Sequence, residues 1–206
     1  MPLASLSRAA LASLLLLTGA CDEDPSGETP DAGQPDAGSA FTVGGSLTAA
    51  AGKQVPASAK LMVLWAVSSG SPDYVYKFGE GTSTGASFSL QLPQLPPADA
   101  LNRGELGVGL MLLEPGTYAL ADGRYEDADP PFEQALGAAG QYAIIYKAKE
   151  QVAGPAWAER FPVGYSCGKG APPATTGGFE TFEPVSCASI SVTVDDIDNI
   201  EFVNWT

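Results

Sequence analysis

The chain has 206 residues, 45% of them hydrophobic and 17% charged, and its formal net charge is −14. Such an acidic balance argues against partners that are nucleic acids and against docking flat on anionic lipid. The sequence contains no histidine, which excludes every mechanism that depends on an imidazole base.

The first 20 residues have the layout of an export signal. Arg8 lies near the amino terminus, an apolar run follows over residues 9–17, and small residues stand at Gly19 and Ala20. The run is shorter than the roughly 20 apolar residues that a membrane-spanning helix needs. We therefore expect residues 1–20 to form a signal peptide rather than a transmembrane helix.

The signal ends in the sequence LTGAC, where Thr18, Gly19 and Ala20 precede Cys21. This pattern resembles the lipobox of bacterial lipoproteins, although that family usually has leucine in the place of Thr18. The resemblance implies that Cys21 is lipidated, with palmitate among its acyl chains, and becomes the first residue of the mature protein. Several acyl chains anchor a protein stably, whereas a single chain does not. The alternative is an ordinary secretory signal that ends near a cysteine.

Residues 21–40 have the composition of a disordered tether. They contain six acidic residues, no basic residue and a doubled PDAG motif, and such a segment has too little apolar surface to offset the entropy of folding. With a lipid on Cys21, the segment would hold a domain away from a membrane in the cell envelope. Asp22 follows the cysteine directly, and the sequence leaves both the inner and the outer membrane open.

Residues 41–206 are long enough for one domain with its own core. This span carries 18 of the 24 acidic and nine of the ten basic residues, because six acids lie in the tether and Arg8 in the signal. Two cysteines remain, Cys167 and Cys187, and in an exported chain such a pair predicts a disulfide. The segment between them holds four glycines and three prolines, so we expect no regular structure there. The alternative is a metal-binding or redox pair. A zinc site would need about four nitrogen or sulfur ligands, and residues 41–206 contain no further cysteine and no histidine.

Short segments of β-forming residues, separated by glycine and proline turns, predict an all-β fold, an antiparallel β-sandwich of prealbumin or immunoglobulin type with little helix. Phe88, Leu90 and Leu92 alternate with polar residues, and Gly107 and Gly109 offer a flat patch for an aromatic ring. Trp65 is expected in the core, and single helical turns near 132–139 and 155–159. The predicted strands are 41–49, 59–67, 74–78, 86–92, 105–114, 141–148, 189–194 and 199–205.

The first half of this domain resembles the carboxypeptidase regulatory, or transthyretin-like, modules. The resemblance is carried by a Gly-x-Leu strand at 45–47, a turn at 52–56 that ends in Val-Pro, a strand at 59–64 and the segment GASFSLQLP at 85–93, which takes the place of the family's Gly-x-Phe strand ending near proline. It covers under a third of the chain. The resemblance implies a β-sandwich without catalytic activity and makes residues 101–206 an elaboration of the module.

Two short motifs match catalytic patterns without their partners. The sequence GTSTG around Ser83 matches a hydrolase nucleophile elbow, but no histidine is present to activate the serine. The spacing of Ser166 and Lys169 matches the Ser-x-x-Lys of penicillin-binding enzymes, but the surrounding glycines argue against the helix that this motif requires. We expect a turn at Ser83, no catalytic residue and no cofactor.

Acidic residues offer a weak candidate for calcium. Asp195, Asp196 and Asp198 are close in sequence, as are the acids of 122–129, and calcium takes six to eight oxygen ligands. Neither cluster has the EF-hand order, so solvated acidic turns are the favoured interpretation and no metal is assigned.

Four aromatic residues, Tyr74, Tyr76, Tyr125 and Trp157, lie in polar segments and are the candidate binding surface for a sugar or a peptide. The first function hypothesis is a lipid-anchored, non-enzymatic binding or scaffolding module for an envelope protein or glycan. The alternatives are a carboxylate-dependent hydrolase and a calcium-dependent adhesion module. A binding module should present a contiguous aromatic patch, and a hydrolase a cleft with two close carboxylates.

Overall fold

The computed structural model describes residues 40–50, 52–67, 74–116, 120–126, 135–171 and 181–194. All of them belong to one compact unit of the chain, Pro35–Thr206. The expected signal peptide, Cys21 and all but the last residue of the expected tether lie outside the described residues, as does the strand predicted at 199–205.

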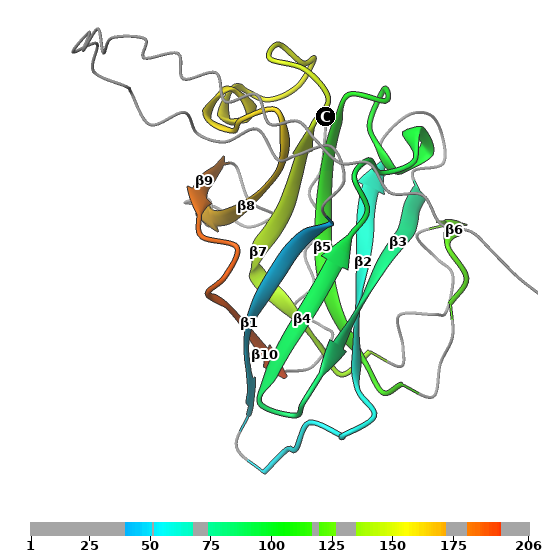
Figure 1. The fold of residues 1–206 in the computed structure, drawn as a ribbon, viewed down its shortest axis with the longest axis vertical. Helices are drawn as coiled ribbons and strands as arrows, with labels where there is room; N and C mark the ends of the chain where they lie inside the picture. The colour runs from blue at the N-terminus through cyan, green and yellow to red at the C-terminus, as the bar shows by residue number, and fades with distance from the viewer. Residues whose placement is uncertain are drawn as a thin grey trace, which may run out of the picture. The chain divides into compact units, whose positions relative to one another are not determined.

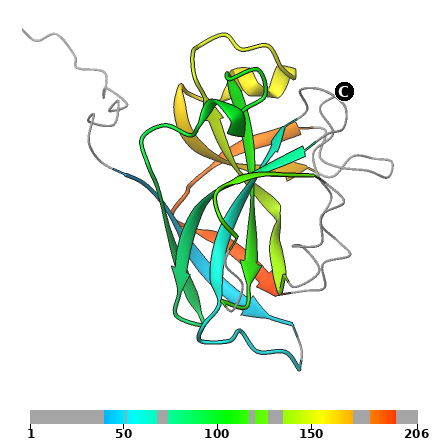
Figure 2. The same cartoon turned by 90° about the vertical axis from the view of Figure 1, so that its right-hand side faces the viewer.

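The described residues are mostly β-strand, which confirms the all-β class (Figure 1). Within the described residues, two short 3-10 helices, η1 (Ala98–Ala100) and η3 (Ala156–Arg160), lie at the same end of the strands (Figure 2). The strands are β1 (Phe41–Ala49), β2 (Lys60–Val67), β3 (Tyr74–Ser83), β4 (Ser87–Leu92), β5 (Leu106–Glu114), β6 (Gly123–Glu126), β7 (Gly137–Lys147), β8 (Gly164–Ala171), β9 (Thr181–Val185) and β10 (Ile190–Val194).

Seven of these strands close into a barrel, in the order β10-β1-β4-β3-β2-β5-β7. The closing contact pairs β7 with β10 at Ala138 and Thr193. β10 runs parallel to β1, while the other pairs of strands are antiparallel. The prealbumin or immunoglobulin sandwich expected from the sequence is not confirmed, because the strands belong to one sheet that closes on itself. Closure removes the free edges that an open sheet would expose.

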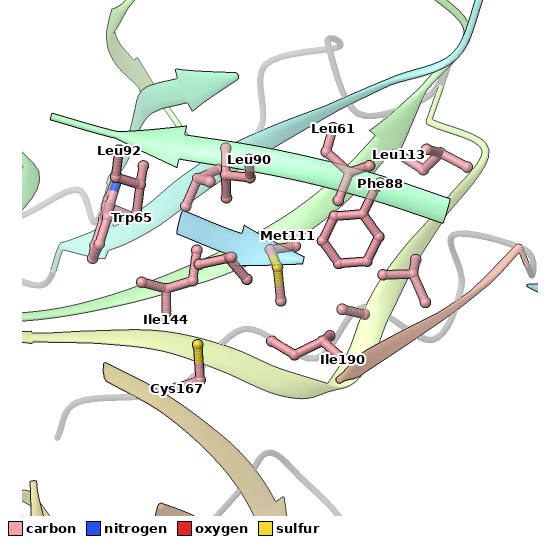
Figure 3. Packing of buried hydrophobic residues seen from close by; sticks show 14 of the residues in the cluster. Leu61, Trp65, Phe88, Leu90, Leu92, Met111, Leu113, Ile144, Cys167 and Ile190 are labelled. Carbon is pink, nitrogen blue, oxygen red and sulfur yellow. The ribbon is translucent and has the colours of Figure 1, made fainter. Parts of the chain in front are cut away.

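The barrel interior is filled by the alternate residues of its strands. Val43, Leu61, Phe88 and Leu90 are at most 5% exposed, and Figure 3 shows side chains of this interior cluster. Trp65 is completely buried, and a Cβ on Gly107 or Gly109 would stand 2.8 or 3.3 Å from its ring. The predicted glycine patch thus holds the ring of Trp65, whose indole nitrogen donates to the carbonyl of Phe78 at 3.0 Å.

Two smaller clusters cover parts of the outer barrel surface, which explains why β2 and β5 are buried on both faces. In one, Trp157 of η3, Phe161 directly after η3 and Phe182 of β9 pack on Leu106 and Val108. In the other, Ala135 and Ala138 cover an outer group that consists of Met62, Leu64 and Leu112.

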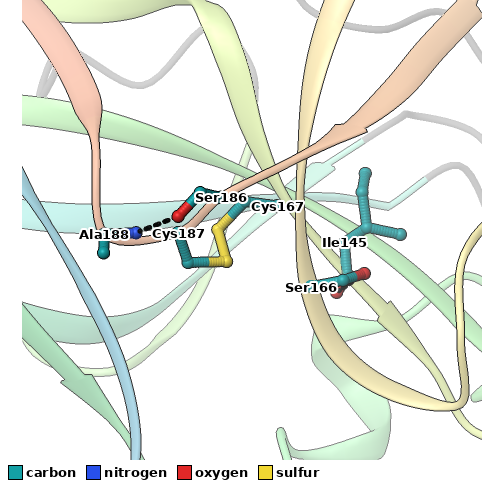
Figure 4. The surroundings of a disulfide bond; sticks show 6 residues. All are labelled: Ile145, Ser166, Cys167, Ser186, Cys187 and Ala188. Carbon is teal, nitrogen blue, oxygen red and sulfur yellow. Dashed lines mark hydrogen bonds between the residues drawn. A yellow bond between two sulfur atoms is a disulfide. The ribbon is translucent and has the colours of Figure 1, made fainter. Parts of the chain in front are cut away.

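The predicted disulfide joins Cys167 to Cys187, with the two Cα atoms 5.3 Å apart (Figure 4). Its place follows from β7, which pairs with β10 near its start and with β8 over Tyr142–Lys147. Cys167 belongs to β8, and Cys187 lies in the turn that leads into β10, where its carbonyl accepts from the Gly44 amide at 2.8 Å. The bond therefore ties β8 to the turn before β10, and both of these strands pair with β7.

The expectation that the segment between the cysteines has no regular structure is wrong. β8 continues to Ala171, and β9 pairs with it from Thr181 to Val185. The glycines favour this arrangement, because a Cβ on Gly168 would press against Phe161 and Phe182 at 3.1 and 3.2 Å. Because Gly168 has no side chain, β8 lies close to the outer aromatic cluster.

Candidate functional site

A polar site lies where β3 changes its partner. β2 pairs with one edge of β3, while the other edge pairs with β6 over Tyr74–Lys77 and with β4 over Gly81–Ser83. An open pocket of about 440 Å³ lies between these two pairings. We name it the fork pocket, and its lining residues are Lys77, Phe78, Gly79, Glu80, Pro93, Leu120 and Asp122.

A bulge in β3 shapes this pocket. In a regular strand, Lys77 and Glu80 would point to opposite faces, because side chains alternate. Here Lys77 faces Leu64 and Glu80 faces Met62 across β2, so one extra residue separates them on β3. The bulge turns both side chains to the outer face. Gly79 adopts φ +104° there, and a Cβ on it would stand 2.6 Å from Leu92, so the position requires glycine.

Lys77 joins the two carboxylates of the pocket. Its side chain is 3% exposed, and its Nζ donates to Glu80 Oε1 at 2.9 Å and to Asp122 Oδ1 at 2.8 Å. Burial alone would lower the pKa of Lys77, but the hydrogen bonds to Asp122 and Glu80 outweigh burial and raise it. The lysine is therefore charged and fixed in place at neutral pH.

Removing both acidic partners should cost more stability than removing the lysine. The Glu80→Gln/Asp122→Asn double variant leaves a buried ammonium without a counter-charge, and we expect its free energy of unfolding to fall by about 2 kcal/mol. Lys77→Met should cost less, because both carboxylates are about half exposed and stay hydrated. Adding Lys77→Met to the double variant should restore most of the loss, as measured by urea unfolding.

The matched control is Glu105→Gln, which breaks the exposed pair of Glu105 with Lys149 and should leave the unfolding midpoint nearly unchanged. A triple variant no more stable than the double variant would contradict this account of Lys77. Because the pKa of Lys77 is raised on folding, its contribution is full below its unfolded pKa of about 10.4 and is lost as the pH rises through the folded value. The variants with Lys77→Met should lack that alkaline loss.

Glu114 of β5 is a further buried acidic residue, and it interacts electrostatically with Lys60 and Glu80. It is 4% exposed, and its Oε2 has no hydrogen-bond partner among the described residues. Burial raises the pKa of Glu114; Lys60 opposes this shift, and Glu80 adds to it. Its contribution to stability is therefore greatest at low pH and declines as the pH rises through its folded pKa.

The four aromatic residues predicted as a binding surface do not form one patch. Trp157 is buried, with its ring centroid 5.1 Å from that of Phe182. Tyr125 pairs with Val75 across β3 and β6, so it lies on the opposite sheet face from Tyr74 and Tyr76. Each of these three tyrosines has a local contact. The Arg124 guanidinium lies 3.8 Å from the Tyr74 ring, Tyr125 donates to the Ala121 carbonyl, and Tyr76 packs against the barrel core.

Another aromatic group packs against the barrel core. Tyr165 stacks on Phe41 with ring centroids 5.2 Å apart and meets Tyr146 edge-on at 4.9 Å. Its hydroxyl is buried and has no hydrogen-bond partner among the described residues. Burial, and then the neighbouring Tyr146, raise the pKa of Tyr165, so this hydroxyl is neutral at physiological pH.

The two catalytic motifs have structural roles. Ser83 ends β3 and donates to the Ala59 carbonyl at 2.8 Å, and the turn to β4 follows with Gly85 at φ +84°. Ser166 and Lys169 lie in β8, where residues three apart point to opposite faces. Neither motif therefore has the geometry of its enzyme.

No three acidic or cysteine side chains of the described ranges converge as a metal ion would require. Asp195, Asp196 and Asp198 lie outside those ranges, as do residues 127–129 of the other acidic cluster. No helix in the described part of the chain has the length and apolar character of a membrane span.

The chain matches no family model, no curated protein and no solved structure.

Proposed function

We propose that the chain is a lipid-anchored protein of a bacterial cell envelope and acts there as a non-enzymatic binding module for a glycan or another envelope protein. The observation that carries the proposal is the disulfide between Cys167 and Cys187, because such bonds persist in oxidising compartments outside the cytosol. The export signal and the lipobox resemblance at Cys21 support the same location. The resemblance of residues 45–93 to transthyretin-like sandwich modules stays part of this proposal and agrees with a non-catalytic role.

The fork pocket supports binding rather than catalysis. Hydrolysis by two carboxylates requires one protonated acid and one free carboxylate or base. Here Glu80 and Asp122 both accept a hydrogen bond from the Lys77 ammonium, so neither is arranged as a proton donor. A carboxylate-dependent hydrolase remains the second candidate, because these two residues meet the requirement of two close carboxylates in a cleft.

The anchor is tested by fractionating bacteria that make the full chain. We expect the wild-type protein in the membrane fraction, labelled by radioactive palmitate and released by detergent but not by salt. Cys21→Ser should abolish the label and the membrane association. The matched control is Cys187→Ala, which changes a different cysteine and should keep both. Membrane association that survives Cys21→Ser without label would sink the lipid-anchor proposal.

A further inference from the structure

We infer that the fork pocket binds a neutral, polyhydroxylated ligand, namely a sugar ring of a glycan. This inference rests on the proposed function and deepens it, because it names a site and a ligand class. The polar groups, the apolar lining and the charge of the pocket each support it.

The polar groups match a hydroxyl group, which donates and accepts at once. The Lys77 ammonium has three N–H bonds, of which one goes to Glu80 and one to Asp122. No acceptor among the described residues takes the third, and the pocket is lined by this side chain. Both carboxylates keep accepting capacity beside that donor. Two neighbouring hydroxyls of a sugar can therefore accept a hydrogen bond from Lys77 and donate to Glu80 and Asp122.

The other lining residues suit the carbon face of a sugar ring. Phe78, Pro93 and Leu120 contribute apolar surface around the three charged groups. The volume of about 440 Å³ lies within the range of roughly 300–1,000 Å³ that is typical of small-molecule sites. A few fixed polar groups within apolar walls orient a ligand and provide specificity.

The charge of the pocket favours a neutral ligand. One ammonium and two carboxylates leave a net negative charge in the pocket, and the whole chain carries −14. An anionic ligand is repelled by this field. A cationic ligand competes with Lys77, which already holds both carboxylates at hydrogen-bond distance.

The pocket is also preorganised. The Lys77 side chain is almost completely buried and held by two partners, and the bulge at Gly79 fixes the direction of Glu80. Little side-chain entropy is therefore lost when a ligand binds.

The test is a titration of the full chain, extracted in detergent, followed by saturation-transfer NMR of the ligand. The neutral probes are cellobiose and the disaccharide of N-acetylglucosamine, with glucosamine as the cationic and glucuronate as the anionic comparison. We expect saturable binding of at least one neutral probe with Kd on the order of 1 mM. Asp122→Asn and Glu80→Gln should each weaken it at least about tenfold, while Glu105→Gln leaves it unchanged.

Binding that persists undiminished in both pocket variants, or no binding of either neutral probe, would overturn the inference and leave the anchored, non-enzymatic module standing. Binding of glucosamine alone would show a cation site and overturn it as well. Cleavage of a disaccharide in the same spectra, lost in Asp122→Asn, would instead overturn the non-enzymatic function. Circular dichroism of each variant shows whether it is folded.

Discussion

Replacing Gly45 with alanine should destabilise the barrel by about 3 kcal/mol or more. Gly45 of β1 pairs with Ile190 of β10. This parallel pair of strands lies next to the contact between β10 and β7 that closes the barrel. A Cβ on Gly45 would stand 1.8 Å from the Ile190 carbonyl oxygen and 2.9 Å from the ring of Phe88. Because the first neighbour is backbone, the overlap is relieved only if β10 moves away from β1. Chemical unfolding followed by tryptophan fluorescence measures the loss.

The adjacent glycine provides the matched control. A Cβ on Gly44 would meet only the Phe88 carbonyl oxygen at 3.6 Å, which is ordinary contact. Gly44→Ala should therefore leave the unfolding midpoint close to that of the wild type. Equal stability of the two variants would contradict the pairing of β1 with β10 and thereby the closed barrel.

Loss of the disulfide should have the second large effect. The Cys167→Ala/Cys187→Ala variant should lose about 3 kcal/mol, because the bond closes a loop between residues 20 apart in sequence. For a domain of this size, that corresponds to a fall in Tm of about 6–12 °C. The expected loss includes packing as well as entropy. The bond ties β8 to the turn before β10, and Cys167 is 1% exposed in the core.

A reductant provides the internal control for this variant. It should lower the Tm of the wild-type protein to near that of the double variant and leave the double variant unchanged. A wild-type Tm that ignores the reductant, with the thiols shown to be reduced, would contradict a stabilising role of the bond.

Strands with a clear residue pattern were predictable from the sequence. β1 begins and ends at the predicted residues, and β4 places Phe88, Leu90 and Leu92 in the core as expected. The 3-10 helix of η3 occupies most of the predicted helical turn at 155–159. By contrast, Gly137–Ala139, placed in a helical turn by the sequence, begins β7.

Strands stabilised by their neighbours were missed. β8 has the sequence GYSCGKGA, which lacks alternation and is rich in glycine, yet it pairs with β7 and β9. β6 is a four-residue strand whose pairing with β3 has no signal of its own. Barrel closure was also not predictable, because it depends on the pairing of strands far apart in sequence.

The fork pocket was missed for a related reason. Lys77 and Asp122 are 45 residues apart and meet only because β6 pairs beside the bulge of β3. One signal was present in the sequence: a lysine within an otherwise apolar and aromatic segment, YVYKF, is rarely buried unless it is paired. The partners of such a lysine depend on which distant strands pair beside it, and the local sequence does not show this.

The measurement that tests the account most directly is the intact, unreduced mass of the protein extracted by detergent from its own membranes. We expect the mass of residues 21–206 plus a lipid increment and minus two hydrogens. The increment corresponds to the anchor on Cys21, and the two missing hydrogens correspond to the Cys167–Cys187 bond. A mass without lipid, or one that retains both thiol hydrogens, would contradict the anchored, oxidised envelope protein proposed here.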